Sequence, residues 1–251
     1  MGIYQEKVLQ TEDRTLCGYY LDKGSENTLV LVPGSYASHT IWKPVVQNAN
    51  IPANLFLVEL PGFGKSTPKE PDSTIEEITA HILTLIDGVG IDRFFIGGHS
   101  IGGMIATEML DHAGDRLEGV ISCEGWVHHS VEQDTFLGRK NETLSEHQLA
   151  LRKHYGTVAR TAWTDEEIGI YSKIWKKWEK GQKLLEETKV PVLEIWGDRG
   201  MPRPDRKALL LPPHDNITLI WLPNGGHSFL VQYPEEVGQM IADFIRERGK
   251  R

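Results

Sequence analysis

The chain is poor in cysteine, has no long apolar stretch and carries no excess of positive charge. Its two cysteines, Cys17 and Cys123, cannot build a disulfide framework, and neither belongs to a Cys-x-x-Cys pair. There are 27 basic against 35 acidic residues, so the formal net charge of −8 would repel a phosphate backbone, and nucleic-acid binding is not expected.

Two further absences concern membranes and secretion. No apolar run approaches the roughly 18 to 20 residues that a membrane span needs. The first ten residues, MGIYQEKVLQ, do not lead from a basic segment into an apolar one, as a secretion signal would. Together with the scarcity of cysteine, this predicts a cytoplasmic protein without a membrane partner, acting as a monomer or homodimer.

The 251 residues, 39% of them hydrophobic, suffice for one large domain or for a domain with a big insertion. Short apolar segments without strict alternation recur along the chain, a pattern typical of strands buried on both faces of a parallel sheet. We expect strands at residues 15–21, 28–32, 54–60, 93–97, 119–123, 190–196 and 217–222.

Helical patterns fall between these strands. A capping box at Thr74 and Glu77 opens one helix, residues 101–113 form another, and Pro234 opens the last. Strand and helix in alternation predict an α/β fold, a mostly parallel sheet flanked by helices.

Residues 125–189 interrupt this alternation with helical patterns and no convincing strand. A second capping box, Thr164 with Glu167, precedes apolar residues at spacings of three and four that end at Trp178. We therefore expect a core domain of residues 1–124 and 190–251, and a helical cap of residues 125–189 inserted after the sixth strand.

The strongest chemical signal is Gly-His-Ser-Ile-Gly at residues 98–102, between a predicted strand and a predicted helix. Ser100 would occupy a sharp strand-to-helix turn that exposes its hydroxyl, and the turn leaves no room for side chains at Gly98 and Gly102. A serine in such a turn is a candidate nucleophile.

A serine hydroxyl needs a base to take its proton. His227 follows the last predicted strand in the loop PNGGH, and the carboxyl ends of parallel strands meet at one edge of the sheet. Two carboxylates could orient its imidazole. We prefer Asp198, which follows residues 190–196, and keep Glu124, which follows residues 119–123, as the alternative; Asp205 ranks third.

An oxyanion hole should complete the site. The backbone N–H of Ile101 is one expected donor, and that of Ser35, in the loop after residues 28–32, is the other. Of the nearby aromatic residues, we expect Tyr36 and Trp126 to contact the substrate.

Several of these segments together resemble the α/β-hydrolase superfamily: VPGS at 32–35, ELPGFGKS at 59–66, GGHSIGG at 97–103, WGDRG at 196–200 and NGGHSF at 224–229. The likeness runs from about Leu16 to Ile245 and includes the helical cap. It implies hydrolysis through an acyl-enzyme, with Ser100 as nucleophile, His227 as base and Asp198 as acid, without cofactor or metal. Some members place the acid after the sixth strand, where Glu124 lies.

Two other motifs partly resemble ligand-binding sites, one for phosphate and one for a metal ion. Gly64-Lys65-Ser66 lacks the earlier glycine of a P-loop, because position 59 is Glu. The pair His128-His129 could ligate a metal, but neighbouring side chains on a regular element point apart and no carboxylate lies at a useful spacing, so no metal site is expected.

The sequence therefore predicts a serine hydrolase that cleaves small carboxylic esters. The same residues could serve a lactone, C–C bond or amide hydrolase, because acyl transfer is common to all of them. A third possibility is a ligand-sensing protein that keeps the three residues and turns over slowly.

Overall fold

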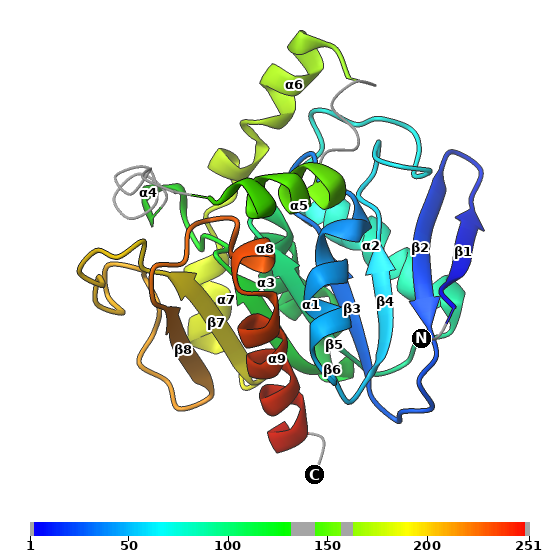
Figure 1. Ribbon diagram of the computed structural model, residues 1–251. Coiled ribbons are helices and arrows are strands. Elements are labelled where there is room, and N and C mark those ends of the chain that lie inside the picture. Colours follow the sequence, from blue (N-terminus) through cyan, green and yellow to red (C-terminus); the bar gives the residue numbers. More distant parts are fainter. Residues whose placement is uncertain (1–2, 132–143, 157–162, 249–251) are drawn as a thin grey trace.

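The computed structural model describes residues 3–131, 144–156 and 163–248. Its centre is an eight-stranded sheet with the strand order β1-β2-β4-β3-β5-β6-β7-β8 (Figure 1). Strands β1 and β2 and strands β2 and β4 pair antiparallel, and all other neighbours pair parallel. The strands are β1 (Gln5–Gln10), β2 (Thr15–Leu21), β3 (Thr28–Val32), β4 (Asn54–Val58), β5 (Phe94–His99), β6 (Leu117–Cys123), β7 (Val192–Gly197) and β8 (Ile217–Leu222).

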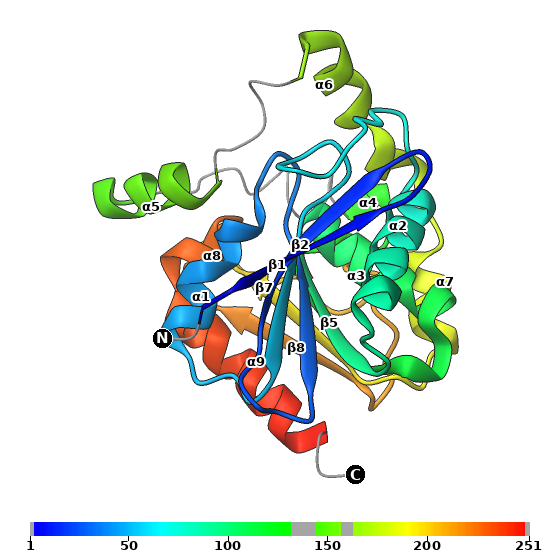
Figure 2. The ribbon, with the colours of Figure 1, turned by 90° about the vertical axis from the view of Figure 1, so that its right-hand side faces the viewer.

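Helices cover both faces of this sheet (Figure 2). One apolar core lies under α2 (Ile75–Val89), α3 (Ile101–Ala113) and α7 (Gly181–Glu187); the other lies under the 3-10 helix η1 (His39–Trp42), α1 (Lys43–Asn48), α8 (Phe229–Gln232) and α9 (Pro234–Arg248). Strand residues alternate between the two cores, so β3 gives Val30 to the first and Leu31 to the second. The predicted mostly parallel sheet with flanking helices is confirmed.

Most of the predicted elements begin and end within two residues of the observed ones. Both capping boxes form: Thr74 caps α2, and Thr164 caps α6 (Asp165–Tyr171). Strand β1 was not predicted from the sequence, and its residues QEKVLQ are largely exposed because the strand lies at the sheet edge. The expectation of one helical run ending at Trp178 was wrong, since α6 stops at Tyr171 and a separate 3-10 turn, η6 (Ile174–Lys177), follows.

Between β6 and β7 the described residues form helices and no strand, as expected for an insertion after β6. These are α4 (His129–Val131), α5 (Glu146–Gly156), α6, the 3-10 helix η6 and α7. Hydrogen bonds fasten this insertion to the core. The indole Nε1 of Trp178 donates to the buried Glu108 of α3 at 2.7 Å, and Trp163 Nε1 donates to the carbonyl of Gly62 at 2.9 Å.

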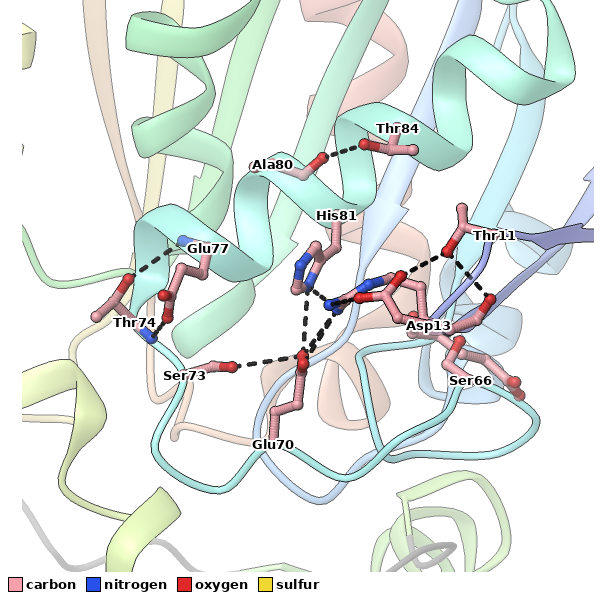
Figure 3. A network of polar contacts seen from close by, with 12 residues as sticks. Thr11, Asp13, Ser66, Glu70, Ser73, Thr74, Glu77, Ala80, His81 and Thr84 are labelled. Carbon is pink, nitrogen blue, oxygen red and sulfur yellow. Dashed lines mark hydrogen bonds and ion pairs between the residues drawn. The ribbon is translucent and has the colours of Figure 1, made fainter.

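A polar network fastens the β1–β2 turn to the loop before α2 (Figure 3). Arg14 donates to both carboxylate oxygens of Glu70, at 3.1 and 3.0 Å, and its Nη1 lies 3.0 Å from His81 Nδ1. Burial and the charge of Arg14 lower the pKa of His81, which suits a neutral ring that accepts this hydrogen bond. The network thus ties the edge hairpin to the loop before α2 and, through His81, to α2 itself.

One acidic side chain, Glu194 of β7, is completely buried in the first apolar core. Its Oε2 accepts a hydrogen bond from Trp196 Nε1 at 3.0 Å. Burial raises the pKa of Glu194 to about 8, against the opposing effect of hydrogen bonds from Trp196 and Ser122. The folded protein therefore keeps this carboxyl protonated at neutral pH.

The stability of the protein should for this reason fall between pH 5 and pH 8. In that window the unfolded chain releases the Glu194 proton and the folded chain retains it, so rising pH favours unfolding. We expect Glu194→Gln to remove a drop of a few kcal/mol in the free energy of unfolding, since one pKa unit is worth about 1.4 kcal/mol. Urea unfolding of both proteins at the two pH values measures this; an identical pH dependence in the variant would contradict it.

Candidate functional site

Ser100 occupies a strained turn between β5 and α3. Its φ of 58° and ψ of −124° lie in a region that a non-glycine residue seldom adopts. The flanking glycines are sterically required: a Cβ on Gly98 would lie 1.8 Å from the carbonyl oxygen of Gly102, and one on Gly102 would lie 2.5 Å from that of Val32. The sharp strand-to-helix turn expected from the sequence is present.

The imidazole of His227 comes from the loop between β8 and α8. Its Nδ1 lies 2.7 Å from Oε2 of Glu124, the residue directly after β6. Glu124 has a φ of 48°, and its side chain is fully buried. Residues from the ends of β5, β6 and β8 thus meet at the carboxyl edge of the sheet, as the parallel order predicts.

The carboxylate of Glu124 is held by several donors. Arg199 donates to both of its oxygens, each at 2.8 Å, and the backbone N–H of Gly197 donates to Oε1 at 3.0 Å. Burial alone would raise the pKa of Glu124, but the hydrogen bonds and charges of His227 and Arg199 outweigh it and hold the pKa at about 2. Glu124 is therefore ionised throughout the neutral range and can orient the Nδ1–H of His227.

Asp198, the acid preferred from the sequence, forms a different set of hydrogen bonds. Its Oδ1 accepts from the backbone N–H groups of Gly200 and Asn224, at 2.9 and 2.7 Å, and its Oδ2 accepts from Arg203 at 2.9 Å. These contacts shape the loop after β7 and join it to the loop that carries His227. The carboxylate that contacts the imidazole in the structure is the alternative, Glu124, at 2.7 Å. The third carboxylate, Asp205, accepts from the N–H of Ala208 in a separate turn.

The loop expected to supply an oxyanion donor lies directly against the nucleophile. A Cβ on Gly34 would be 3.3 Å from that of Ser100, and Ser35 lines the same pocket as Ser100. Ile101 is the first residue of α3, so its N–H has no intrahelical acceptor and points out of the helix N-terminus. The assignment of Ser35 and Ile101 as oxyanion donors remains a prediction that this arrangement permits.

Ser100 and His227 line one pocket of about 250 Å³. Of the described residues that line it, one is an arginine, Arg152 of α5, whose Nη1 lies 3.4 Å from Oγ of Ser228. Apolar and small side chains make up most of the remaining wall: Gly34, Ser35, Ala37, Ile41, His99, Ser228, Leu230 and Val231. As far as the described residues line it, the pocket is small and mainly apolar, with the guanidinium of Arg152 in its wall.

The two aromatic residues expected to contact substrate link the insertion to the core. Tyr36 donates its hydroxyl to the carbonyl of Ile168 at 3.0 Å, and its ring packs edge-on against Tyr171. Trp126 stacks on the His227 ring at a centroid distance of 5.7 Å and on Trp175 at 5.6 Å. Trp126 therefore lies beside the imidazole, whereas Tyr36 is occupied with holding α6; substrate contact stays a prediction for both.

His99 is a functional neighbour that the sequence reasoning quoted only as part of a motif. Its Nε2–H donates to the backbone carbonyl of His227 at 2.7 Å. Burial and the charge of the His227 ring lower the pKa of His99 to about 3, so it stays neutral and acts as a fixed donor. The one sequence signal for this role is the position of His99 directly before Ser100, because a side chain there lies near the loop after β8 that carries His227.

A mostly parallel sheet, a strained serine at the end of β5 and a histidine from the loop after β8 define the α/β-hydrolase class. Consistent with this, residues 29–239 match the model of the alpha/beta hydrolase family, and the chain belongs to that family. Among the described residues, no helix is both long and apolar enough to cross a bilayer.

Two relatives and one solved structure are similar to this protein over most of the chain. A 2-hydroxy-6-oxononadienedioate/2-hydroxy-6-oxononatrienedioate hydrolase of Paraburkholderia phymatum is 24% identical, over 90% of each chain. A putative carbamate hydrolase RutD of Caulobacter sp. is 28% identical, over 87% of this chain and 90% of its own. A thermophilic esterase from Thermogutta terrifontis superposes with a TM-score of 0.74 at 19% identity, over 97% and 98% of the two chains.

Proposed function

We propose that the protein is a serine hydrolase that cleaves small carboxylic esters with Ser100, His227 and Glu124. The observation that carries the proposal is the imidazole of His227, held by Glu124 at 2.7 Å while it lines the same pocket as Ser100. An ionised acid, an oriented histidine and a serine in the same pocket are the parts that acyl transfer requires.

In the proposed reaction, His227 Nε2 takes the proton of the Ser100 hydroxyl as Oγ attacks the ester carbonyl. The N–H groups of Ser35 and Ile101 stabilise the oxyanion, and Glu124 stabilises the imidazolium. His227 then protonates the departing alcohol as the C–O bond breaks, leaving an acyl-enzyme. Water then attacks the acyl carbon while His227 takes its proton; the bond from that carbon to Ser100 Oγ breaks, and His227 returns the proton to Oγ as the carboxylic acid leaves. No metal or cofactor takes part.

Arg152 suggests which esters the pocket accepts. A guanidinium beside an apolar pocket binds a carboxylate by two parallel hydrogen bonds, a pairing that a neutral acyl chain cannot offer. The α5 helix that carries Arg152 is held to the core by Gln148, which donates to the carbonyl of Gln232 at 3.5 Å, and by Leu151, which packs on the second core. We therefore propose that the acyl chain ends in a carboxylate.

A matched pair of substrates tests the proposal. Monomethyl glutarate and methyl valerate differ at the end of the acyl chain, where one has a carboxylate and the other a methyl group. We expect the wild-type kcat/KM to favour monomethyl glutarate at least tenfold, Arg152→Gln to abolish the preference, and Lys153→Gln, on the same helix, to keep it. Equal rates for the two esters that Arg152→Gln leaves unchanged would overturn the anionic-substrate proposal.

The same experiment separates the alternatives. The similarity to a dioate hydrolase makes C–C bond cleavage of a dicarboxylate the strongest of these. Turnover of a 2-hydroxy-6-oxo dienedioate without turnover of either ester would replace ester hydrolysis by C–C cleavage. A single stoichiometric burst of nitrophenol from nitrophenyl butyrate, with no sustained release, would instead favour a sensing role.

A further inference from the structure

A second group of chemically competent side chains lies in the insertion. His128 and His129 follow β6, and Glu179 lies between η6 and α7, 50 residues along the chain from His129. One ligand atom from each of the three residues lies within 4.8 Å of the other two. The sequence expectation that no carboxylate meets the histidine pair was therefore wrong, because the partner comes from the far end of the insertion.

The two imidazoles do not point apart, as they would on a regular element. His128 precedes α4 and His129 is its first residue, and their rings lie with centroids 4.2 Å apart at an angle of 34°. Each ring faces the same oxygen: Oε1 of Glu179 lies 3.5 Å from His128 Nε2 and 3.4 Å from His129 Nδ1. The three ligand atoms thus converge on one point.

We propose that His128, His129 and Glu179 bind a divalent transition-metal ion of the zinc type. Zinc–ligand bonds of about 2.0–2.1 Å in a tetrahedron place neighbouring ligand atoms about 3.3 Å apart, close to the distances from Glu179 to both rings. Two imidazoles and one carboxylate are a ligand set that zinc prefers, and they leave a fourth position for water.

The surroundings of both rings fit this assignment. His129 Nδ1 is buried and makes no hydrogen bond among the described residues, and Glu179 Oε1 faces it at 3.4 Å. The backbone N–H of Ser130 donates to His128 Nδ1 at 3.2 Å, and Ser130 Oγ lies 2.9 Å from the same nitrogen. These contacts hold the ring so that Nε2 faces Glu179, as outer hydrogen bonds orient most metal-binding histidines.

The ion would join the two ends of the insertion. Its histidines belong to the segment that leaves β6, two residues after the Trp126 that stacks on His227. Its glutamate lies between Trp178, which donates to Glu108, and Lys180, which forms an ion pair with the same Glu108 at 2.6 Å. Bound metal would therefore hold the segment carrying Trp126 against the part of the insertion already anchored on α3.

The test is calorimetric titration of the tag-free, chelator-treated full chain with Zn²⁺. We expect one ion per chain, a dissociation constant raised at least tenfold in His128→Ala, His129→Ala and Glu179→Gln, and no change in His214→Ala. Zinc should also raise the melting temperature of the wild type and leave that of His129→Ala unchanged. Circular dichroism without metal shows whether each variant folds, and Glu179→Gln changes the shape least.

Absence of binding, or equal binding by the wild type and all three variants, would overturn the proposal. The test does not depend on the proposed ester hydrolysis, because it needs no substrate. Ser100→Ala should bind zinc as the wild type does, so a failure of the hydrolase proposal and a failure of the metal site would give different results.

Discussion

Ser100→Ala should lower kcat for ester hydrolysis on the order of 10⁶-fold, equivalent to about 8 kcal/mol of transition-state stabilisation. The variant keeps the pocket and its backbone donors but lacks the oxygen that forms the acyl-enzyme, so only weak residual catalysis can remain. Steady-state hydrolysis of nitrophenyl butyrate, with burst kinetics to detect any acyl-enzyme, measures the loss.

The fold should tolerate this change. Alanine has the same Cβ as serine at the strained φ of 58°, and the Ser100 side chain makes no capping hydrogen bond to α3. Ser172→Ala, which removes an exposed hydroxyl of the insertion, is the matched control and should retain full turnover. If Ser100→Ala kept more than a tenth of wild-type turnover, its hydroxyl could not be the nucleophile and the proposed reaction would fall.

What the sequence could predict follows from features that are local in the chain. The Ser100 turn needs glycine on both sides for steric reasons, and the buried strands of a parallel sheet are continuous apolar runs. These features predict from the sequence alone that Ser100 and His227 lie at one edge of the sheet, because the carboxyl ends of parallel strands are on the same side.

The acid could not be chosen in this way, since both candidates follow neighbouring strands. The family resemblance favoured Asp198, but two features that only the fold reveals support Glu124 in this position. The backbone at Glu124 turns to a φ of 48°, and the buried Arg199 comes back from the next loop to hold its carboxylate. Glu179 escaped notice for a similar reason, because its approach to His128 and His129 is a contact between distant parts of the chain.

The proposed roles of the two carboxylates lead to the second large effect. Glu124→Gln should lower kcat by about 10⁴-fold, because the amide can no longer stabilise the imidazolium or fix the tautomer of His227. Asp198→Asn should cost less than tenfold. Its amide oxygen can still accept from the N–H groups of Gly200 and Asn224, and the partner it loses, Arg203, is half-exposed.

Stability must be separated from catalysis in this comparison. Arg199 is 3% exposed, and losing its charged partner costs roughly 3–5 kcal/mol, so Glu124→Gln should also melt at a lower temperature. Glu124→Asp retains the charge for Arg199 but withdraws the carboxylate from His227, so it should restore most of the stability and little of the turnover. Should Asp198→Asn instead lose 10³-fold or more while Glu124→Gln loses less than tenfold, Asp198 would orient the imidazole during the reaction, and the contact between Glu124 and His227 would serve only the fold.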